Sequence, residues 1–91
     1  SQEIEALLPA LEKVCVLLET KHPGAQEQAA WALGNAAYES AQVRGLLQSP
    51  VMVRRVLEAV ASDQLAVARK ASWLLNNLLQ DREVRTALFL Q

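Results

Sequence analysis

Apolar residues recur along this chain three or four positions apart, which is the spacing of one face of an α-helix. No segment alternates between apolar and polar residues as a half-buried β-strand would. The two clearest apolar stripes predict amphipathic helices of about three turns each. Their apolar positions are Leu11, Val14, Cys15, Leu17 and Leu18 in the first helix, and Val53, Val56, Leu57 and Val60 in the second.

Proline and serine indicate where the helices begin. Pro9 and Pro50 suit the first turn of a helix, where a missing amide costs nothing, and Ser49 is a good N-cap before Pro50. These two helices are expected to end near residues 21–24 and 62–63. Longer helices are predicted over about residues 25–38 and 64–80, each followed by a short helix that Ser40 or Asp81 caps. The short helices carry their apolar residues at Val43, Leu46 and Leu47, and at Val84, Leu88 and Leu90.

A repeat relates the two halves of the chain. The pattern Trp-x-x-x-Asn occurs at Trp31 and again at Trp73, so residue 31 corresponds to residue 73 at an offset of 42 positions. Further pairs at this offset are Ala29 with Ala71, Leu33 with Leu75, Asn35 with Asn77, and Glu39 with Asp81. Helical units of this length are typical of an α-solenoid, in which neighbouring units bury their apolar faces on each other. We therefore predict an all-α chain, an α-solenoid with repeats over about residues 9–48 and 49–91.

The composition narrows the possible functions. The 91 residues are 52% hydrophobic with three glycines and three prolines, too apolar for disorder and too poor in turn residues for a many-stranded β fold. Nine basic and ten acidic residues give a formal net charge of −1, which excludes a generally basic nucleic-acid surface and a polybasic membrane anchor. The longest apolar run, residues 14–18, is far shorter than the roughly 20 residues that cross a bilayer. We therefore expect a soluble chain that binds neither nucleic acid nor membrane.

No enzyme activity, metal or cofactor is expected from the sequence. Cys15 is the only cysteine, lies at a position that should face the core, and has no neighbouring base. His22 is the only histidine and falls in a predicted loop beside Pro23. The chain also shows no carboxylate pair suited to acid–base catalysis and no glycine-rich loop for phosphate.

A stripe of polar and aromatic residues lies opposite the predicted core. In the helix over residues 25–38, Ala29, Leu33, Ala36 and Ala37 point in one direction, and Trp31 points nearly the opposite way. The stripe consists of Gln28, Trp31, Asn35 and Glu39 in the first repeat, and Lys70, Trp73, Asn77 and Asp81 in the second.

The residue types of this stripe suit an extended peptide. Asparagine can donate to and accept from a peptide backbone, and tryptophan offers a flat wall for an aliphatic or cationic side chain. The alternative is that each Trp packs against the neighbouring repeat and each Asn ties down a helix end.

Two segments of the chain resemble a known family. Residues 26–37, QEQAAWALGNAA, resemble the third helix of an armadillo repeat and are especially similar to those of the importin-α nuclear import adaptors. Residues 71–78, ASWLLNNL, resemble the same helix of the next repeat. The resemblance implies that the α-solenoid is an armadillo- or HEAT-type superhelix. It also implies a concave groove that holds a basic nuclear localisation peptide, and a protein of the cytoplasm, the nucleus or both.

The resemblance also implies which residues line that groove. They are Trp31, Asn35, Trp73 and Asn77, with Gln28 on the same stripe and Glu39 as the acidic neighbour. Three positions depart from the family pattern: Lys70 opposes a cationic peptide, Tyr38 replaces a small residue, and Asn76 stands where the first repeat has Gly34.

A chaperone regulator is the alternative function. Residues 69–79, RKASWLLNNLL, are also similar to the armadillo-type nucleotide-exchange factors of heat-shock chaperones, which hold a folded ATPase lobe. Those relatives usually lack the doubled Trp-x-x-x-Asn. In either case the partner is a protein or a peptide, and self-association is also expected, because two repeats leave an unpaired apolar face at each end.

Overall fold

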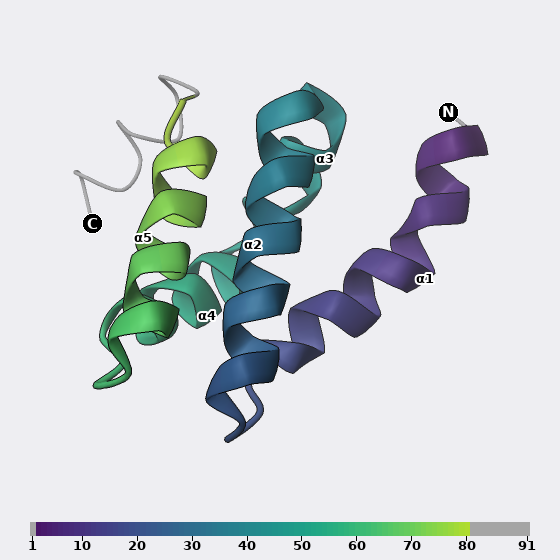
Figure 1. The fold of residues 1–91 in the computed structure, drawn as a ribbon. Coiled ribbons are helices and arrows are strands. Elements are labelled where there is room, and N and C mark those ends of the chain that lie inside the picture. The colour runs from purple at the N-terminus through teal and green to yellow at the C-terminus, as the bar shows by residue number, and fades with distance from the viewer. Residues whose placement is uncertain (1, 81–91) are drawn as a thin grey trace.

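The computed structural model describes residues 2–80, and this part of the chain folds into five α-helices with no β-strand. In chain order they are α1 (Gln2–Leu17), α2 (Pro23–Glu39), α3 (Ala41–Leu46), α4 (Pro50–Val60) and α5 (Leu65–Leu78). The two helices that carry the Trp-x-x-x-Asn pattern, α2 and α5, lie side by side and run in the same direction (Figure 1). α1 and α3 pack against α2, and α4 packs against α5. The all-α prediction is confirmed, with helices arranged as in a fragment of an α-solenoid.

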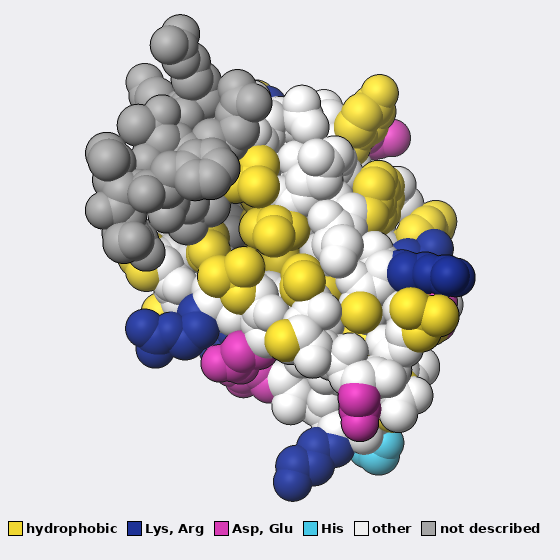
Figure 2. Space-filling view, turned by 90° about the vertical axis from the view of Figure 1, so that its left-hand side faces the viewer, with side chains coloured by type: hydrophobic (Ala, Val, Ile, Leu, Met, Phe, Trp, Pro, Cys, Tyr) yellow, Lys and Arg dark blue, Asp and Glu magenta, His cyan; other side chains and the backbone are white. Residues whose placement is uncertain are grey.

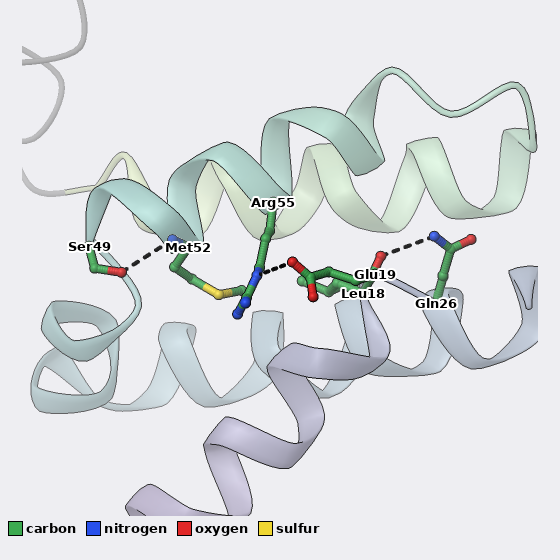
Figure 3. A network of polar contacts seen from close by, with 6 residues as sticks. All are labelled: Leu18, Glu19, Gln26, Ser49, Met52 and Arg55. Atoms are coloured by element: carbon green, nitrogen blue, oxygen red, sulfur yellow. Dashed lines mark hydrogen bonds and ion pairs between the residues drawn. The ribbon is translucent and has the colours of Figure 1, made fainter. Parts of the chain in front are cut away.

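Two serine caps begin helices where the sequence predicts them. The Ser40 hydroxyl oxygen accepts a hydrogen bond from the Val43 amide at 3.1 Å and begins α3. The Ser49 hydroxyl oxygen accepts one from the Met52 amide at 3.2 Å and begins α4, with Pro50 in the first turn (Figure 3). Each bond satisfies an amide that would otherwise lack a partner in the helix. The short helix predicted after Asp81 lies outside the described residues.

The predicted helix start at Pro9 is wrong. α1 begins at Gln2, and Pro9 lies inside it. The segment before the proline is rich in Glu, Ala and Leu, which are strong helix formers. The helix therefore extends on both sides of Pro9, although a proline cannot donate the main-chain hydrogen bond of its own position.

The core forms around the predicted inner face of α2. Ala29, Leu33 and Ala37 are buried there, and Ala36 is partly buried beside them, which confirms the helical-phase prediction. Their buried neighbours come from all the other helices and from the residues that follow α1 and α3: Cys15, Leu18, Val43, Leu47, Met52, Val56, Leu74 and Leu78.

Three positions that were predicted for the core are exposed instead. They are Leu17, Leu46 and Leu57. Each adjoins a residue that is buried, and consecutive residues of a helix point about 100° apart. Leu57 corresponds to the buried Cys15 at the repeat offset, so the two repeats do not bury the same positions.

Polar contacts join the end of α1 to α2 and α4 (Figure 3). The Gln26 side-chain amide donates to the Leu18 carbonyl at 3.0 Å. The Arg55 guanidinium donates to the Glu19 carboxylate, with 2.7 Å between Nε and Oε1. Because 51% of the Glu19 side chain is exposed, water screens this ion pair, and it stabilises the fold by at most about 1 kcal/mol.

Apolar side chains are also present on the surface of α4 and α5. Val51 and Leu65 are 60% and 62% exposed. Viewed from the α5 side, hydrophobic side chains gather beside the residues drawn in grey, and charged side chains lie along the lower edge (Figure 2). A further repeat or a second copy of the chain could cover such a surface, and self-association stays a prediction.

None of the helices within residues 2–80 is both long and apolar enough to cross a membrane.

Candidate functional site

An open hollow lies between α2 and α5. It holds about 550 Å³ and is lined by Glu27, Trp31 and Asn35 of α2 and by Ala66, Arg69, Lys70 and Trp73 of α5. A smaller hollow of about 270 Å³ is lined by Glu27, Gln28, Trp31 and Lys70. Because the two hollows share three residues, they form one continuous surface, which we call the tryptophan groove.

Trp31 and Asn35 form the α2 wall of the tryptophan groove, and their role in binding a peptide stays a prediction. The Trp31 side chain points away from the core face of α2, and the residue is 49% exposed. Asn35 lies one helical turn further on and is half-buried. Within residues 2–80 its side-chain amide forms no hydrogen bond, so it can both donate to and accept from a ligand.

Trp73 lines the groove and also packs against α2. Its six-membered ring lies over Gly34 in the middle of that helix. A Cβ atom at position 34 would collide with Cζ3 of Trp73 and would lie 2.6 Å from Cε3. The absence of a side chain at Gly34 is therefore what allows the indole to approach the α2 backbone. The alternative reading of the sequence was that each tryptophan packs against the neighbouring repeat. This is so for Trp73 but not for Trp31.

Asn77 does not lie on the open face, and its predicted placement there is wrong. It is 4% exposed, and its Nδ2 donates to the Gly34 carbonyl oxygen across the helix contact at 2.9 Å. A buried amide needs such a partner, and α2 supplies one because Gly34 lets α5 come close. Asn77 therefore links α5 to α2 by a buried hydrogen bond.

The remaining predicted site residues are divided between the groove and its surroundings. Gln28 is exposed and Lys70 is half-buried, and both line the groove. Glu39 is exposed but lines neither hollow. Asp81 lies outside the described residues.

Two charged groove residues, Glu27 and Arg69, were not predicted. Each stands four positions before a tryptophan, and they correspond to each other at the repeat offset of 42 positions, from 27 to 69. Residues four positions apart lie on the same helix face, so this spacing was a usable signal. The stripe described from the sequence includes the residues three positions before each tryptophan, Gln28 and Lys70. It does not include the residues four positions before, Glu27 and Arg69.

Cys15 belongs to the core. It is 8% exposed, and burial raises the pKa of its thiol, an effect that the nearby Arg55 charge only partly opposes. The thiol is thus protonated at neutral pH. Within residues 2–80, no three His, Cys, Asp or Glu side chains are grouped in a way that could hold a metal ion.

Comparison with known proteins identifies the family. The family description "Armadillo/beta-catenin-like repeat" matches residues 4–38, which include Trp31 and Asn35. Importin subunit alpha-9 of Arabidopsis thaliana is 34% identical to the chain over 87 residues, which is 94% of the chain. Residues 4–38 therefore form an armadillo repeat, and nearly the whole chain is similar in sequence to an importin α subunit.

The armadillo match at residues 4–38 covers most of α1 and α2, and the importin match extends over nearly the whole chain. The armadillo repeats of this chain are therefore importin-α-like in sequence, as the resemblance predicted. The chain spans 17% of the length of Importin subunit alpha-9. No solved structure matches it significantly.

Proposed function

We propose that the tryptophan groove binds an extended peptide segment and that the chain is part of a non-enzymatic adaptor similar to importin-α. The observation that carries this proposal is that Trp31 and Trp73, on neighbouring parallel helices, line one open hollow of about 550 Å³. Ligand sites are concave and combine aromatic walls with a few polar groups that fix orientation, and the groove has both. An indole that is half exposed at such a site offers a large contact area to a partner.

The groove offers distinct contacts for the side chains and for the backbone of a peptide. A ligand side chain that entered the hollow would lie between the two indoles. The Asn35 amide would exchange hydrogen bonds with the ligand backbone, which is possible because it has no partner within residues 2–80. Each such bond contributes about 0.5–1.5 kcal/mol to binding.

The nuclear import role rests on the family similarity. The match to Importin subunit alpha-9 supports an adaptor that carries a bound segment, in the cytoplasm, the nucleus or both. The importin-type ligand would be a basic nuclear localisation peptide, and within residues 2–80 Glu27 is the one carboxylate that lines the groove for it. Arg69 and Lys70 line the same groove and would repel such a peptide.

A panel of labelled short peptides that spans basic, neutral and acidic sequences tests peptide binding. Fluorescence anisotropy with the wild-type chain identifies the peptides that bind, and the best of them is then titrated against Trp31→Ala. Removing this indole should weaken binding by about 2 kcal/mol or more, because aromatic residues in a groove are frequent hot spots. The matched control is Tyr38→Ala, which removes an aromatic ring from the same helix at a residue that is 73% exposed and outside the groove.

Three results would contradict the proposal. One is that no peptide of the panel binds, and another is that Trp31→Ala and Tyr38→Ala weaken binding equally. The third is tight binding of a heat-shock chaperone ATPase lobe with no peptide binding, which would instead identify the chain as a chaperone regulator.

A further inference from the structure

Among residues 2–80, the charges that line the tryptophan groove are mainly positive. Arg69 and Lys70 contribute two cations from α5, and Glu27 contributes one carboxylate from α2. The whole chain has a formal net charge of −1, so the net charge of these groove residues is opposite in sign to that of the chain. Glu39, the acidic neighbour that the family resemblance suggests, lines neither hollow and does not change this balance.

The two cations are available to a ligand. Neither Arg69 nor Lys70 forms an ion pair or a side-chain hydrogen bond within residues 2–80. Arg55, by contrast, is paired with Glu19, and neither residue lines the groove. Lys70 is also half-buried beside the tryptophans, where a charge is less well solvated than on an open surface. A ligand carboxylate at this position would therefore contribute more to the binding free energy than a carboxylate on the open surface.

We infer that the segment held in the tryptophan groove is acidic, with an Asp or Glu beside an apolar residue. The inference rests on the peptide-binding role proposed above and names the ligand class for it. The apolar side chain would lie between Trp31 and Trp73, and the neighbouring carboxylate would meet Arg69 and Lys70 on the α5 side. A lysine-rich peptide in the same place would bring its ammonium groups to two unpaired cations, which opposes binding.

Three matched peptides test the charge preference directly. They share one length and one central leucine, and they differ only in the flanking pair, which is Glu-Glu, Gln-Gln or Lys-Lys. At low ionic strength the Glu peptide should bind roughly threefold to tenfold more tightly than the Gln peptide, as expected for two partly exposed charge pairs. The Lys peptide should bind more weakly than either. Added salt should reduce these differences, because it screens exposed charges.

Two double variants with the same change in net charge identify the residues responsible. Arg69→Gln with Lys70→Gln should make the Glu and Gln peptides bind equally. Lys13→Gln with Arg54→Gln alters two exposed cations outside the groove and should leave the preference for the Glu peptide intact. Glu27→Gln should strengthen binding of the Glu peptide, because it removes a carboxylate that lines the groove. Circular dichroism of each variant establishes that it is folded.

The possible failures are distinguishable. Equal binding of the Glu and Gln peptides at low salt, or tighter binding of the Lys peptide, overturns the inference and leaves peptide binding in place. An equal loss of preference in the two double variants also overturns it, because the effect would then belong to net charge. If none of the three peptides binds and the wider peptide panel also fails, both the inference and the proposed function are wrong.

Discussion

The two copies of Trp-x-x-x-Asn share their sequence pattern but differ in their surroundings. In the α2 copy, Trp31 is 49% exposed and Asn35 forms no side-chain hydrogen bond within residues 2–80. In the α5 copy, Trp73 lies over Gly34, and Asn77 is 4% exposed and donates to the Gly34 carbonyl. One copy is open to a ligand, whereas the other mainly holds two helices together.

The neighbouring helix explains this difference. α5 packs along α2, and its Trp and Asn contact Gly34 of that helix, whereas within residues 2–80 Asn35 of the α2 copy forms no hydrogen bond to a neighbouring helix. The motif therefore does not determine its own role. In this chain the Trp-x-x-x-Asn pattern of α5 packs on α2, where Gly34 leaves its helical carbonyl oxygen accessible to a second donor, and the pattern of α2 remains open.

The largest stability effects should come from the inner faces of the two helices. Leu33→Ala and Leu74→Ala each remove a fully buried side chain and should lower the free energy of unfolding by about 2–5 kcal/mol. Leu75→Ala should cost less, because Leu75 is only partly buried although it corresponds to Leu33 at the repeat offset. Chemical denaturation of the three variants measures this order. Leu75→Ala as the most damaging change would mean that the repeat offset, and not the observed burial, identifies the core.

Adding a methyl group at Gly34 should break the contact that distinguishes the two copies. Gly34→Ala brings a Cβ atom against the Trp73 ring and should destabilise the chain by about 1–3 kcal/mol. The matched control is Gly45→Ala in α3, where a Cβ meets nothing within 4 Å. That control should stabilise the chain by about 0.5–1 kcal/mol, since alanine favours a helix over glycine. Thermal or chemical unfolding should therefore show opposite signs, and the same sign for both would contradict the packing of Trp73 on Gly34.

The two asparagines should differ in their contribution to stability. Asn77→Ala removes a buried hydrogen bond to the Gly34 carbonyl and should cost about 1 kcal/mol. Asn35→Ala should change stability by less than about 0.5 kcal/mol, because Asn35 is half-buried and has no such bond. Asn35→Ala should instead weaken the binding of a peptide. Equal stability losses in urea denaturation would show that the two copies are equivalent after all.

Trp31→Ala should destabilise the chain much less than the change to the buried Leu33 on the same helix. The indole is half exposed, so its removal should cost less than about 1 kcal/mol, well below the cost of Leu33→Ala. Tyr38→Ala, at a residue that is 73% exposed, provides a baseline for loss of a surface aromatic ring. A Trp31→Ala variant that unfolds as readily as Leu33→Ala would assign Trp31 to the core and remove it from the groove.

Local sequence chemistry was sufficient for most of the helix boundaries. Ser40 and Ser49 cap the helices they were predicted to cap, because an N-cap depends on residues only two or three positions away. The angular spacing of residues around a helix also placed Leu33 correctly on the core face and Trp31 on the opposite, outward face. The start of α1 was missed because Pro9 suits a first turn but does not prevent a helix from forming on both sides of it.

The role of Asn77 could not be predicted from its own surroundings in the sequence. It depends on Gly34, which is 43 positions away and contacts it only after α2 and α5 have packed together. The exposure of Leu57 has a similar cause, since the buried Cys15 stands at the corresponding position of the other repeat but has different neighbours. Two charged residues of the groove could have been predicted from the sequence, because Glu27 stands one turn before Trp31 and Arg69 stands one turn before Trp73.

Gly34 has a consequence for the shape of any longer protein built from these repeats. It lets α5 approach α2 closely enough for Trp73 to cover the backbone and for Asn77 to reach the carbonyl at 2.9 Å. The corresponding position on α5 is Asn76, which is exposed and carries a full side chain. A helix stacked on α5 in the way that α5 lies on α2 would meet that side chain and would have to stand further away or turn. We therefore expect the spacing or the angle between helices to change at Asn76 wherever a further repeat packs on α5.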